Sequence, residues 1–360
     1  MFTLLPLAAL ALAGSSLAAT TCNGHAELCS RQYSNVTFIG AHDSYAVGDS
    51  IADNQDKDVT DQLNDGIRTL QLQAHNASDG VHLCHTSCAL LDGGLLSDYL
   101  GKVVSWVSSN PNDVVTIILT NPENLPVSTY SPILSSSGIE TYLYQPSSSS
   151  LALSDWPTLG ELVDQKKTVV AFLDFEADFS TEPGLIDEFS NMWEDAYDVT
   201  DASFQCAVNR TSGSASSQMY MINHFLDTTY AFGGTSFFVP NKDALNTTNA
   251  ESGDGSIGYH VGNCVQLWGR NPNHILLDFY DTTSNVPFNV AASLNGVSQP
   301  TNTVTAGDAT TSTTSGSTAK VSTSNLSSSA VGSFDGAKNG FILALGIVGA
   351  GTVGLSKVFM

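Results

Sequence analysis

Between residues 36 and 279, short runs of β-branched and apolar residues alternate with longer segments of helical periodicity. The strand candidates are 36–40, 67–72, 114–119, 168–174, 219–223 and 274–279, and helix-like segments lie at 95–109, 159–165 and 183–193. Several runs are almost continuously apolar, as expected for parallel strands that are buried on both faces. This alternation predicts an α/β fold, and a single (β/α)8 TIM-type barrel fits a folded region of about 280 residues.

A doubly wound parallel sheet is the alternative arrangement of the same elements. Such sheets often bind a dinucleotide at a glycine-rich turn after the first strand. Here the first predicted strand is followed by Ala-His-Asp-Ser-Tyr at 41–45, without a Gly-x-Gly-x-x-Gly turn. The sequence therefore gives no sign of a dinucleotide site, and we expect no cofactor.

Both ends of the chain have the composition of processing signals. Residues 1–18 contain an apolar run followed by small residues, which predicts a secretory signal peptide cleaved near Ala18. Residues 334–360 end in an apolar, glycine-rich stretch after a polar spacer and small residues, the order typical of a GPI-attachment signal. A retained hydrophobic tail anchor is the alternative, but the apolar stretch at 341–355 is shorter than the about 20 residues that span a bilayer.

Residues 21–299 are expected to form the barrel, and residues 300–333 a linker. The linker is rich in Ser, Thr, Ala and Gly and has almost no large apolar residue, so it cannot bury enough surface to fold. We therefore expect a disordered Ser/Thr-rich stalk between the barrel and a GPI anchor, in a protein that is secreted and held at the cell surface.

The strongly acidic composition limits the partners. The chain has 35 Asp and Glu residues against 12 Lys and Arg residues, a net charge of −23. Binding of nucleic acid depends on Lys and Arg contacts to phosphates, so no nucleic-acid partner is expected. Anionic membrane surfaces should repel the chain, although the acidity is also consistent with simple solubility outside the cell.

Six cysteines remain after the predicted signal peptide, and an even number in an exported chain indicates disulfides. Fifteen pairings are possible; local spacing favours Cys22–Cys29 and Cys84–Cys88, which leaves Cys206–Cys264. A zinc site at Cys84-His85-x-x-Cys88 is the alternative, but no second ligand pair has suitable spacing, so no metal is expected. Sequons for N-glycosylation begin at Asn35, Asn76, Asn209, Asn246 and Asn325.

Histidines occur where two predicted strands end. His42 and Asp43 follow the first strand, and His85 follows a short apolar run at 81–84. The carboxyl ends of barrel strands line the active site. Phosphodiester cleavage needs one group to accept a proton and another to donate one, and imidazole suits both roles because its pKa is near neutrality. A structural role is the alternative for either histidine alone.

The order of these motifs resembles the X domain of phosphatidylinositol-specific phospholipases C, and most closely its secreted fungal PLC-like branch. The motifs that carry the resemblance are Gly40-Ala41-His42-Asp43-Ser44, Gln62-Leu63-x-x-Gly66-Ile67-Arg68, Leu83-Cys84-His85, Asn110-Pro111-Asn112-Asp113, Trp156-Pro157-Thr158-Leu159, Asn223-His224-Phe225, Pro272-Asn273-His274 and Asp278-Phe279-Tyr280. They span nearly all of the predicted folded region, and their joint order is more specific than any one of them.

The resemblance implies a distorted (β/α)8 barrel that cleaves an inositol phospholipid or a related phosphodiester without metal. His42 would be the general base toward the inositol 2-hydroxyl, and His85 the general acid toward the leaving oxygen. Asp278 matches the carboxylate that orients the base, and Asp43 matches the residue that follows the first histidine.

The chain departs from the family at two positions on the second strand. Family members carry an acidic residue where this chain has Gln71, and an arginine or a calcium-binding acid where it has Gln73. Charged groups there stabilise the phosphoryl oxygens, so two amides put the activity in doubt. Arg68 points to the opposite face of the strand, whereas His75 shares the face of Gln71 and Gln73. We therefore assign these glutamines and His75 to substrate binding, with His75 as a hypothetical source of positive charge.

Two other functions compete with the phosphodiesterase. A catalytically weak barrel could serve as a binding protein at the cell surface, which Gln71 and Gln73 would permit. A glycerophosphodiesterase would need a carboxylate-rich metal site on the second strand, which these glutamines oppose. Asp174–Asp178 and His224, at two further strand ends, are weaker site candidates, and Trp193, Glu194, Asp195 and Trp268 are expected to serve packing.

Overall fold

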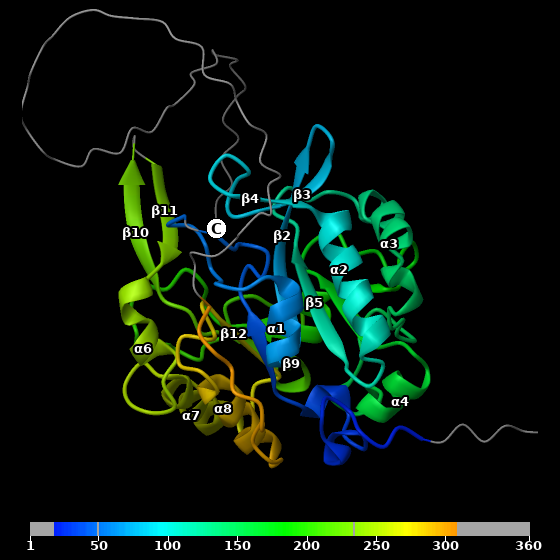
Figure 1. Ribbon diagram of the computed structural model, residues 1–360. Coiled ribbons are helices and arrows are strands. Elements are labelled where there is room, and N and C mark those ends of the chain that lie inside the picture. The colour runs from blue at the N-terminus through cyan, green and yellow to red at the C-terminus, as the bar shows by residue number, and fades with distance from the viewer. Residues whose placement is uncertain (1–17, 49, 233–234, 308–360) are drawn as a thin grey trace, which may run out of the picture. The chain divides into compact units, whose positions relative to one another are not determined.

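The computed structural model describes residues 18–48, 50–232 and 235–307 (Figure 1). The strands are β1 (Phe38–Ala41), β2 (Thr69–Ala77), β3 (Gly80–Cys84), β4 (Asp92–Leu95), β5 (Val115–Thr120), β6 (Val169–Leu173), β7 (Leu185–Asp187), β8 (Met192–Glu194), β9 (Met219–Asn223), β10 (Asp227–Phe232), β11 (Thr235–Pro240) and β12 (His274–Leu277). The α-helices are α1 (Val59–Asp65), α2 (Leu96–Ser109), α3 (Ser131–Ser137), α4 (Leu159–Asp164), α5 (Glu188–Asn191), α6 (Leu245–Thr248), α7 (Ile257–Trp268) and α8 (Val286–Asn295).

A curled sheet of parallel strands forms the centre of the molecule. Its strands follow the order β7, β6, β5, β2, β1, β12, β9, β8, and neighbouring pairs are all parallel. Helices cover its outer side, with α2, α3 and α4 flanking β5 and with α7 and α8 beside β12 and β9 (Figure 1). This is the predicted α/β barrel of the TIM type, and the doubly wound alternative is wrong.

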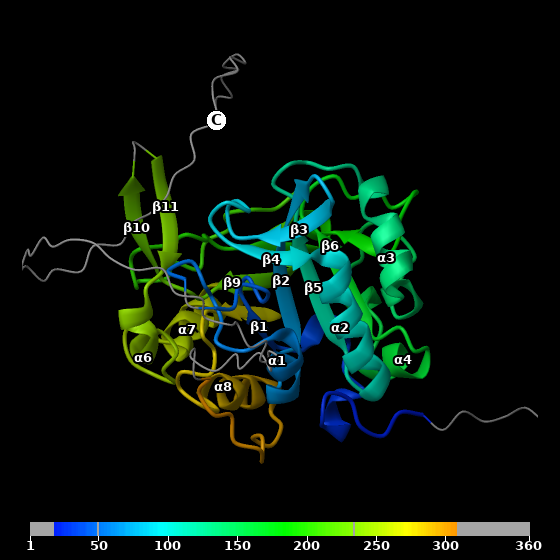
Figure 2. The same ribbon diagram turned by 45° about the horizontal axis from the view of Figure 1, so that its top comes forward.

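The antiparallel strands lie at one end of the barrel. β3 pairs with the far end of β2 and with β4, while β10 and β11 form a separate hairpin. Figures 1 and 2 show both groups at the same end of the molecule, the end toward which β2 runs. They extend the wall of the barrel at the carboxyl ends of its strands.

The long predicted helix at 95–109 is confirmed as α2. Its apolar side chains recur with helical spacing and are buried: Leu96, Tyr99, Leu100, Val103, Trp106 and Val107. The helix predicted at 159–165 is α4, which begins with a capping box between Thr158 and Glu161. The six predicted barrel strands also coincide, within a few residues, with β1, β2, β5, β6, β9 and β12.

The helix predicted at 183–193 is wrong. This segment contains β7, a single helical turn α5, and β8. Asp187 accepts a hydrogen bond from the backbone N–H of Ser190 and so begins the helical turn. Leu185, Ile186, Met192 and Trp193 are buried in the sheet, so tertiary burial overrides the local helical pattern. The missed segment contributes two barrel strands.

The three disulfides Cys22–Cys29, Cys84–Cys88 and Cys206–Cys264 are those favoured by the spacing. Within the described segments, no helix has both the length and the apolar character needed to cross a membrane. The signal peptide predicted at 1–18, apart from residue 18, lies outside the described residues. The same holds for the predicted stalk beyond residue 307 and for the tail at 334–360.

We expect the Cys206–Cys264 disulfide to stabilise the fold most, because it joins residues 58 positions apart, against 7 for Cys22–Cys29. Loop-closure entropy gives about 4 kcal/mol for the long loop and about 2 kcal/mol for the short one. Chemical denaturation of Cys206→Ser/Cys264→Ser and Cys22→Ser/Cys29→Ser variants would measure both losses. A larger loss from the short loop would contradict this ranking.

Candidate active site

A cavity of about 400 Å³ lies at the carboxyl ends of the barrel strands. Its lining includes His42, Gln71, Gln73, His75, His85, Asp174, Glu194, Tyr197, Asp198, Arg210, Asn223, Phe225 and Asp227. TIM barrels place their active sites at this face. Another cavity, of about 420 Å³, is lined by residues at the start of β1 and by residues 297–302, and none of the predicted site residues is in its lining.

His42 follows β1 and is fixed by a carboxylate that follows β12. Its Nδ1 lies 2.9 Å from Oδ1 of Asp278, and because a carboxylate only accepts, Nδ1 is the donor and Nε2 is free to accept a proton. Phe225 stacks on the imidazole, with ring centres 3.7 Å apart. Burial alone would lower the pKa of His42, but the negative charges of Asp278 and Asp43 outweigh it and raise this pKa to about 9.

His85 follows β3 and lies between the bonded cysteines Cys84 and Cys88. Its Nδ1 donates a hydrogen bond of 2.9 Å to the carbonyl oxygen of Ala52. A carbonyl only accepts, so Nδ1 is the donor of this bond. Nε2 is therefore the ring nitrogen left to face the cavity and Asp43.

The two imidazoles converge on Asp43. Oδ2 of Asp43 lies 3.9 Å from Nε2 of His42 and 3.7 Å from Nε2 of His85. The carboxylate is fully buried, and burial raises its pKa, although both histidines oppose this shift. The structure thus brings together all four predicted catalytic residues, with Nε2 of His42 and Nε2 of His85 both directed at Asp43.

The backbone is constrained where each of these groups leaves its strand. Asp43, Thr86 and Phe279 have positive φ angles of 40°, 60° and 43°, a region that residues other than glycine rarely adopt. Each follows one of the predicted residues His42, His85 and Asp278. Strained conformations of this kind gather at functional sites, where the surrounding structure holds them in place.

The two glutamines that depart from the family pattern hold Asp43. Oε1 of Gln71 accepts a hydrogen bond of 2.8 Å from the backbone N–H of Asp43. Nε2 of Gln73 donates one of 2.8 Å to Oδ2 of Asp43. Both line the cavity as predicted, but their polar atoms are directed to Asp43. Their direct contribution is therefore to hold Asp43 in position rather than to supply charge.

His75 also lines the cavity, and its Nδ1 lies 3.1 Å from Oε1 of Glu123. Any positive charge on His75 is therefore compensated by a neighbouring carboxylate. Its assignment as a substrate-binding cation stays a prediction that this pairing weakens.

Arg210 supplies a cation that the sequence reasoning missed. Its Nη2 lies 2.8 Å from Oε2 of Glu194, and its guanidinium carbon lies 4.4 Å from the ring centre of Tyr197 and 5.2 Å from that of Phe189. Burial acts to lower the pKa of Arg210, but the charges of Glu194 and Glu188 outweigh it and raise this pKa. The buried Nε has no hydrogen-bond partner among the described residues. The guanidinium is thus held rigidly with donor capacity to spare.

Arg210 belongs to an irregular segment between β8 and β9, where no strand-end motif points to it. The sequence feature that could have drawn attention to Arg210 is the scarcity of basic residues, since the chain has only 12 Lys and Arg among 360 residues. The backbone of Arg210 pairs with Glu194 in an isolated antiparallel bridge, which fixes it to the barrel wall. Glu194 was expected to serve packing, but the structure places it in the lining of the cavity.

Further carboxylates surround the imidazoles. Burial raises the pKa of Asp227 to about 7, and the charge of Asp278 adds to this shift. Burial likewise raises the pKa of Asp174 to about 6. Asp174 accepts a hydrogen bond from the backbone N–H of Asn121 and lines the cavity, so part of the weaker 174–178 candidate reaches the site.

His224 does not reach the cavity. It is buried, with Nε2 donating to the carbonyl oxygen of Thr248 and Nδ1 lying 3.0 Å from Nδ1 of His260. Its structural role agrees with the alternative kept open from the sequence. Burial lowers the pKa of His224 to about 3, so it stays neutral.

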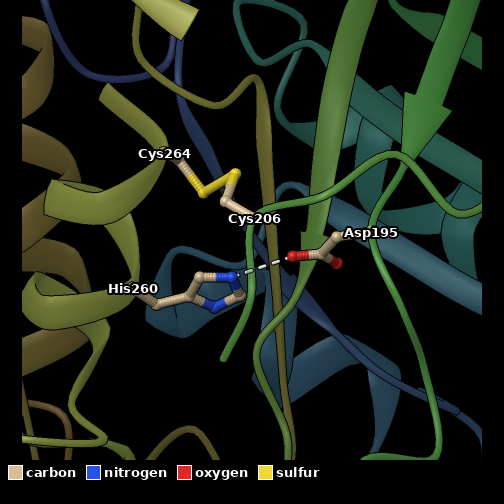
Figure 3. A group of neighbouring side chains, drawn as sticks. All are labelled: Asp195, Cys206, His260 and Cys264. Atoms are coloured by element: carbon tan, nitrogen blue, oxygen red, sulfur yellow. Dashed lines mark ion pairs between the residues drawn. A yellow bond between two sulfur atoms is a disulfide. The ribbon is translucent and has the colours of Figure 1, made fainter. Parts of the chain in front are cut away.

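Among the described residues, one group has metal-ligating types close together: Asp195, Cys206, His260 and Cys264 (Figure 3). The two sulfurs are bonded to each other, so neither is a thiolate that could bind a metal. Oδ2 of Asp195 lies 2.8 Å from Nε2 of His260. Burial raises the pKa of Asp195 and lowers that of His260 to about 3, which favours a neutral pair. The Cys84–Cys88 disulfide likewise removes the ligands of the zinc alternative.

This α/β barrel carries two imidazoles and a buried carboxylate at the carboxyl ends of its strands. The arrangement places the chain in the class of phospholipase-C-like phosphodiesterase folds. The family model described as PI-PLC X 1 matches residues 28–295. Among curated proteins, the chain is 44% identical over 262 residues to "PI-PLC X domain-containing protein 1" of Arthroderma benhamiae, covering 72% of this chain and 84% of that one. It is 42% identical over 283 residues to an "Uncharacterized secreted protein" of the same organism, covering 77% of this chain and 64% of the relative.

Among solved structures, the phosphatidylinositol-specific phospholipase C from Listeria monocytogenes superposes with a TM-score of 0.50. The alignment covers 76% of this chain and 98% of that enzyme, at 14% sequence identity. This likeness concerns the fold alone. The chain belongs to the PI-PLC X family.

Replacing Asp278 by Asn should lower the pKa of His42 from about 9 toward or below 6.5, because burial remains while the nearest negative charge is lost. The C2–H resonance of His42, followed by NMR from pH 5 to 10, would measure this shift. The stability that the ion pair provides should be fully present below pH 6.5 and lost as the pH rises through about 9. An unchanged His42 titration in the variant would contradict the assignment of Asp278 as its partner.

Proposed function

We propose that this chain is a secreted phosphodiesterase that cleaves the phosphodiester of an inositol phospholipid or of a related polyhydroxylated headgroup. The observation that carries the proposal is the convergence of the two Nε2 atoms, each within 4.0 Å of the same carboxylate oxygen of Asp43. A phosphorus atom in front of this carboxylate would have a proton acceptor and a proton donor within reach. Secretion is supported by the name of the relative called a secreted protein.

In the proposed reaction, Nε2 of His42 takes the proton of a headgroup hydroxyl beside the phosphate. The oxygen of this hydroxyl bonds to phosphorus, the bond from phosphorus to the leaving oxygen breaks, and Nε2 of His85 gives that oxygen its proton. A cyclic phosphodiester and a free alcohol result. Asp278 holds His42 in the required tautomer and stabilises the imidazolium formed in this step. Because the pKa of His42 is about 9, its neutral form becomes more abundant as the pH rises from 7 to 9.

The cavity lining supports a headgroup with several hydroxyls. Glu194, Asp198 and Asn223 provide oxygens that accept hydrogen bonds from hydroxyl groups. Tyr197 offers an aromatic face against which a ring can pack. A cavity of about 400 Å³ is in the range of small-molecule sites. These groups lie beside the imidazoles, so a bound headgroup would place its phosphate between them.

Arg210 supports activity despite Gln71 and Gln73. Its guanidinium carries a permanent positive charge. The planar arrangement of its N–H donors suits two oxygens of a phosphate or two vicinal hydroxyl oxygens. This cation comes from the segment after β8 rather than from β2, so the cavity has a cation despite the amides on β2. Like His75, Arg210 is paired with a carboxylate, Glu194, but its Nε has no hydrogen-bond partner among the described residues and can still donate to a substrate oxygen. The intact His42–Asp278 and His85–Asp43 arrangement likewise favours an enzyme over a binding protein.

Replacing His42 or His85 by Ala should each lower turnover by about 10²–10⁴-fold, the usual contribution of a general base or acid. The assay is release of a cyclic phosphate from phosphatidylinositol, with and without EDTA. His82→Ala is the matched control, since His82 lies on β3 but pairs with Asp79 and Asp92 outside the cavity lining. Equal activity of His42→Ala and the wild type would overturn the proposal.

Replacing Arg210 by Gln should lower kcat/KM by about 10²–10³-fold, in the range seen when one charge-stabilising donor is lost. Arg210→Lys keeps the charge beside Glu194 but loses the planar donor set, so it should recover only part of the rate. Lys102→Gln, at an exposed position, is the control. Thermal unfolding of each variant separates a lost contact from lost folding, and full activity of a folded Arg210→Gln protein would contradict the assignment.

A further inference from the structure

The sequons of the described residues are not distributed evenly around the barrel. Their asparagines are all exposed: Asn35, Asn76, Asn209 and Asn246. Asn35 precedes β1 at the end of the barrel away from the cavity, and Asn246 lies in the short helix α6. Asn76 and Asn209, in contrast, are each the direct chain neighbour of a residue that lines the cavity, His75 and Arg210.

Asn76 is held firmly at the cavity wall. It lies on β2 opposite Val81 of β3, so its backbone belongs to an antiparallel ladder. Glu123 accepts a hydrogen bond from the backbone N–H of Asn76 through Oε2, at 3.1 Å, and contacts His75 through Oε1. A group attached to the exposed side chain of Asn76 would thus start at a fixed point beside His75.

Asn209 is fixed in a comparable way at another part of the wall. Its backbone N–H donates a hydrogen bond of 2.8 Å to the carbonyl oxygen of Glu194, the last residue of β8. The N–H of Arg210 donates to the same oxygen at 3.2 Å. The side chain of Asn209 is exposed while its neighbour Arg210 faces the cavity.

These two positions lie at different parts of the cavity wall. Three strands, β1, β12 and β9, separate β2 from β8 in the order of the curled sheet. The neighbours of the two asparagines, His75 and Arg210, nevertheless line the same cavity. Substituents at Asn76 and Asn209 would therefore stand at two separate places beside its opening.

We propose that N-linked glycans at Asn76 and Asn209 flank the mouth of the cavity and keep it away from a packed bilayer. Each glycan is attached when the side-chain amide nitrogen of Asn loses a proton and bonds to C1 of a sugar. In the same step the bond from C1 to the lipid-linked pyrophosphate breaks, and this pyrophosphate leaves. The glycans are bulky and hydrophilic, so they cannot enter the hydrocarbon region of a membrane. This inference rests on the proposed function and narrows its substrates.

The substrates selected in this way are phosphodiesters in solution, or headgroups that protrude well above a surface. The net charge of −23 acts in the same direction, because anionic lipid surfaces repel the chain. Phe175 and Tyr197 are exposed and line the cavity, and the exposed Tyr230 stacks on Phe237, which also lines it. The glycans would limit contact between these aromatic side chains and a bilayer.

The test uses the full chain secreted from a eukaryotic host, with glycopeptide mass spectrometry to establish occupancy at each sequon. Asn76→Gln/Asn209→Gln is compared with the matched pair Asn35→Gln/Asn246→Gln. Sedimentation measures binding to phosphatidylcholine vesicles that contain phosphatidylinositol. The rate on these vesicles is divided by the rate on monomeric short-chain phosphatidylinositol. We expect both quantities to rise severalfold in the first variant and to stay unchanged in the second.

Empty sequons at Asn76 or Asn209 in the secreted protein would overturn the inference, as would equal vesicle binding by the two variants. If the double substitution unfolds the chain, endoglycosidase treatment of the folded Asn35→Gln/Asn246→Gln protein removes the glycans at Asn76 and Asn209 after folding, and the treated and untreated forms are compared instead. If no form cleaves either lipid, the proposed function fails, while vesicle binding still decides whether the glycans hold the mouth away from a bilayer.

Discussion

The parallel pairing of β1 with β12 is the constraint on which the site depends. Ala41 and Leu277 are partners in this ladder, so the next residue of each strand, His42 and Asp278, emerges at the same height. The strands can approach because residue 40 is glycine: a Cβ there would lie 2.5 Å from a methyl carbon of Leu276 and 2.9 Å from Cβ of Thr69. An ion pair between residues 236 positions apart thus follows from backbone register, with Gly40 providing the space.

The electrostatics of the cavity follow from that pairing. Several carboxylates share a small, partly buried volume with three imidazoles and the guanidinium of Arg210. Burial and mutual repulsion raise the pKa values of Asp43 and Asp227, while the same negative charges raise that of His42. Protons are therefore held in the free site near neutral pH. An anionic phosphate entering this cavity meets a field less negative than the count of carboxylates implies.

The sequence was sufficient for the features that repeat or that lie at strand ends. Almost continuous apolar runs located six barrel strands, and histidines after two strands located the end of the barrel that holds the cavity. It failed at 183–193, where a helical pattern covers two short strands, because burial against neighbouring strands outweighs local preference over so few residues. It missed Arg210, which reaches the cavity from an irregular segment whose course depends on long-range contacts. The link from Gln71 and Gln73 to Asp43 was also beyond it, since hydrogen bonds between side chains require coordinates.

The short Cys84–Cys88 cross-link has a consequence for when the site becomes complete. His85 belongs to the five-residue ring that this bond closes, and its imidazole contacts Ala52 and Asp43 outside the ring. A newly made chain with free thiols lacks that ring, so the segment that carries His85 has more conformations open to it. Oxidation of this cysteine pair therefore restricts the segment that carries His85 at a time after the chain itself has been made.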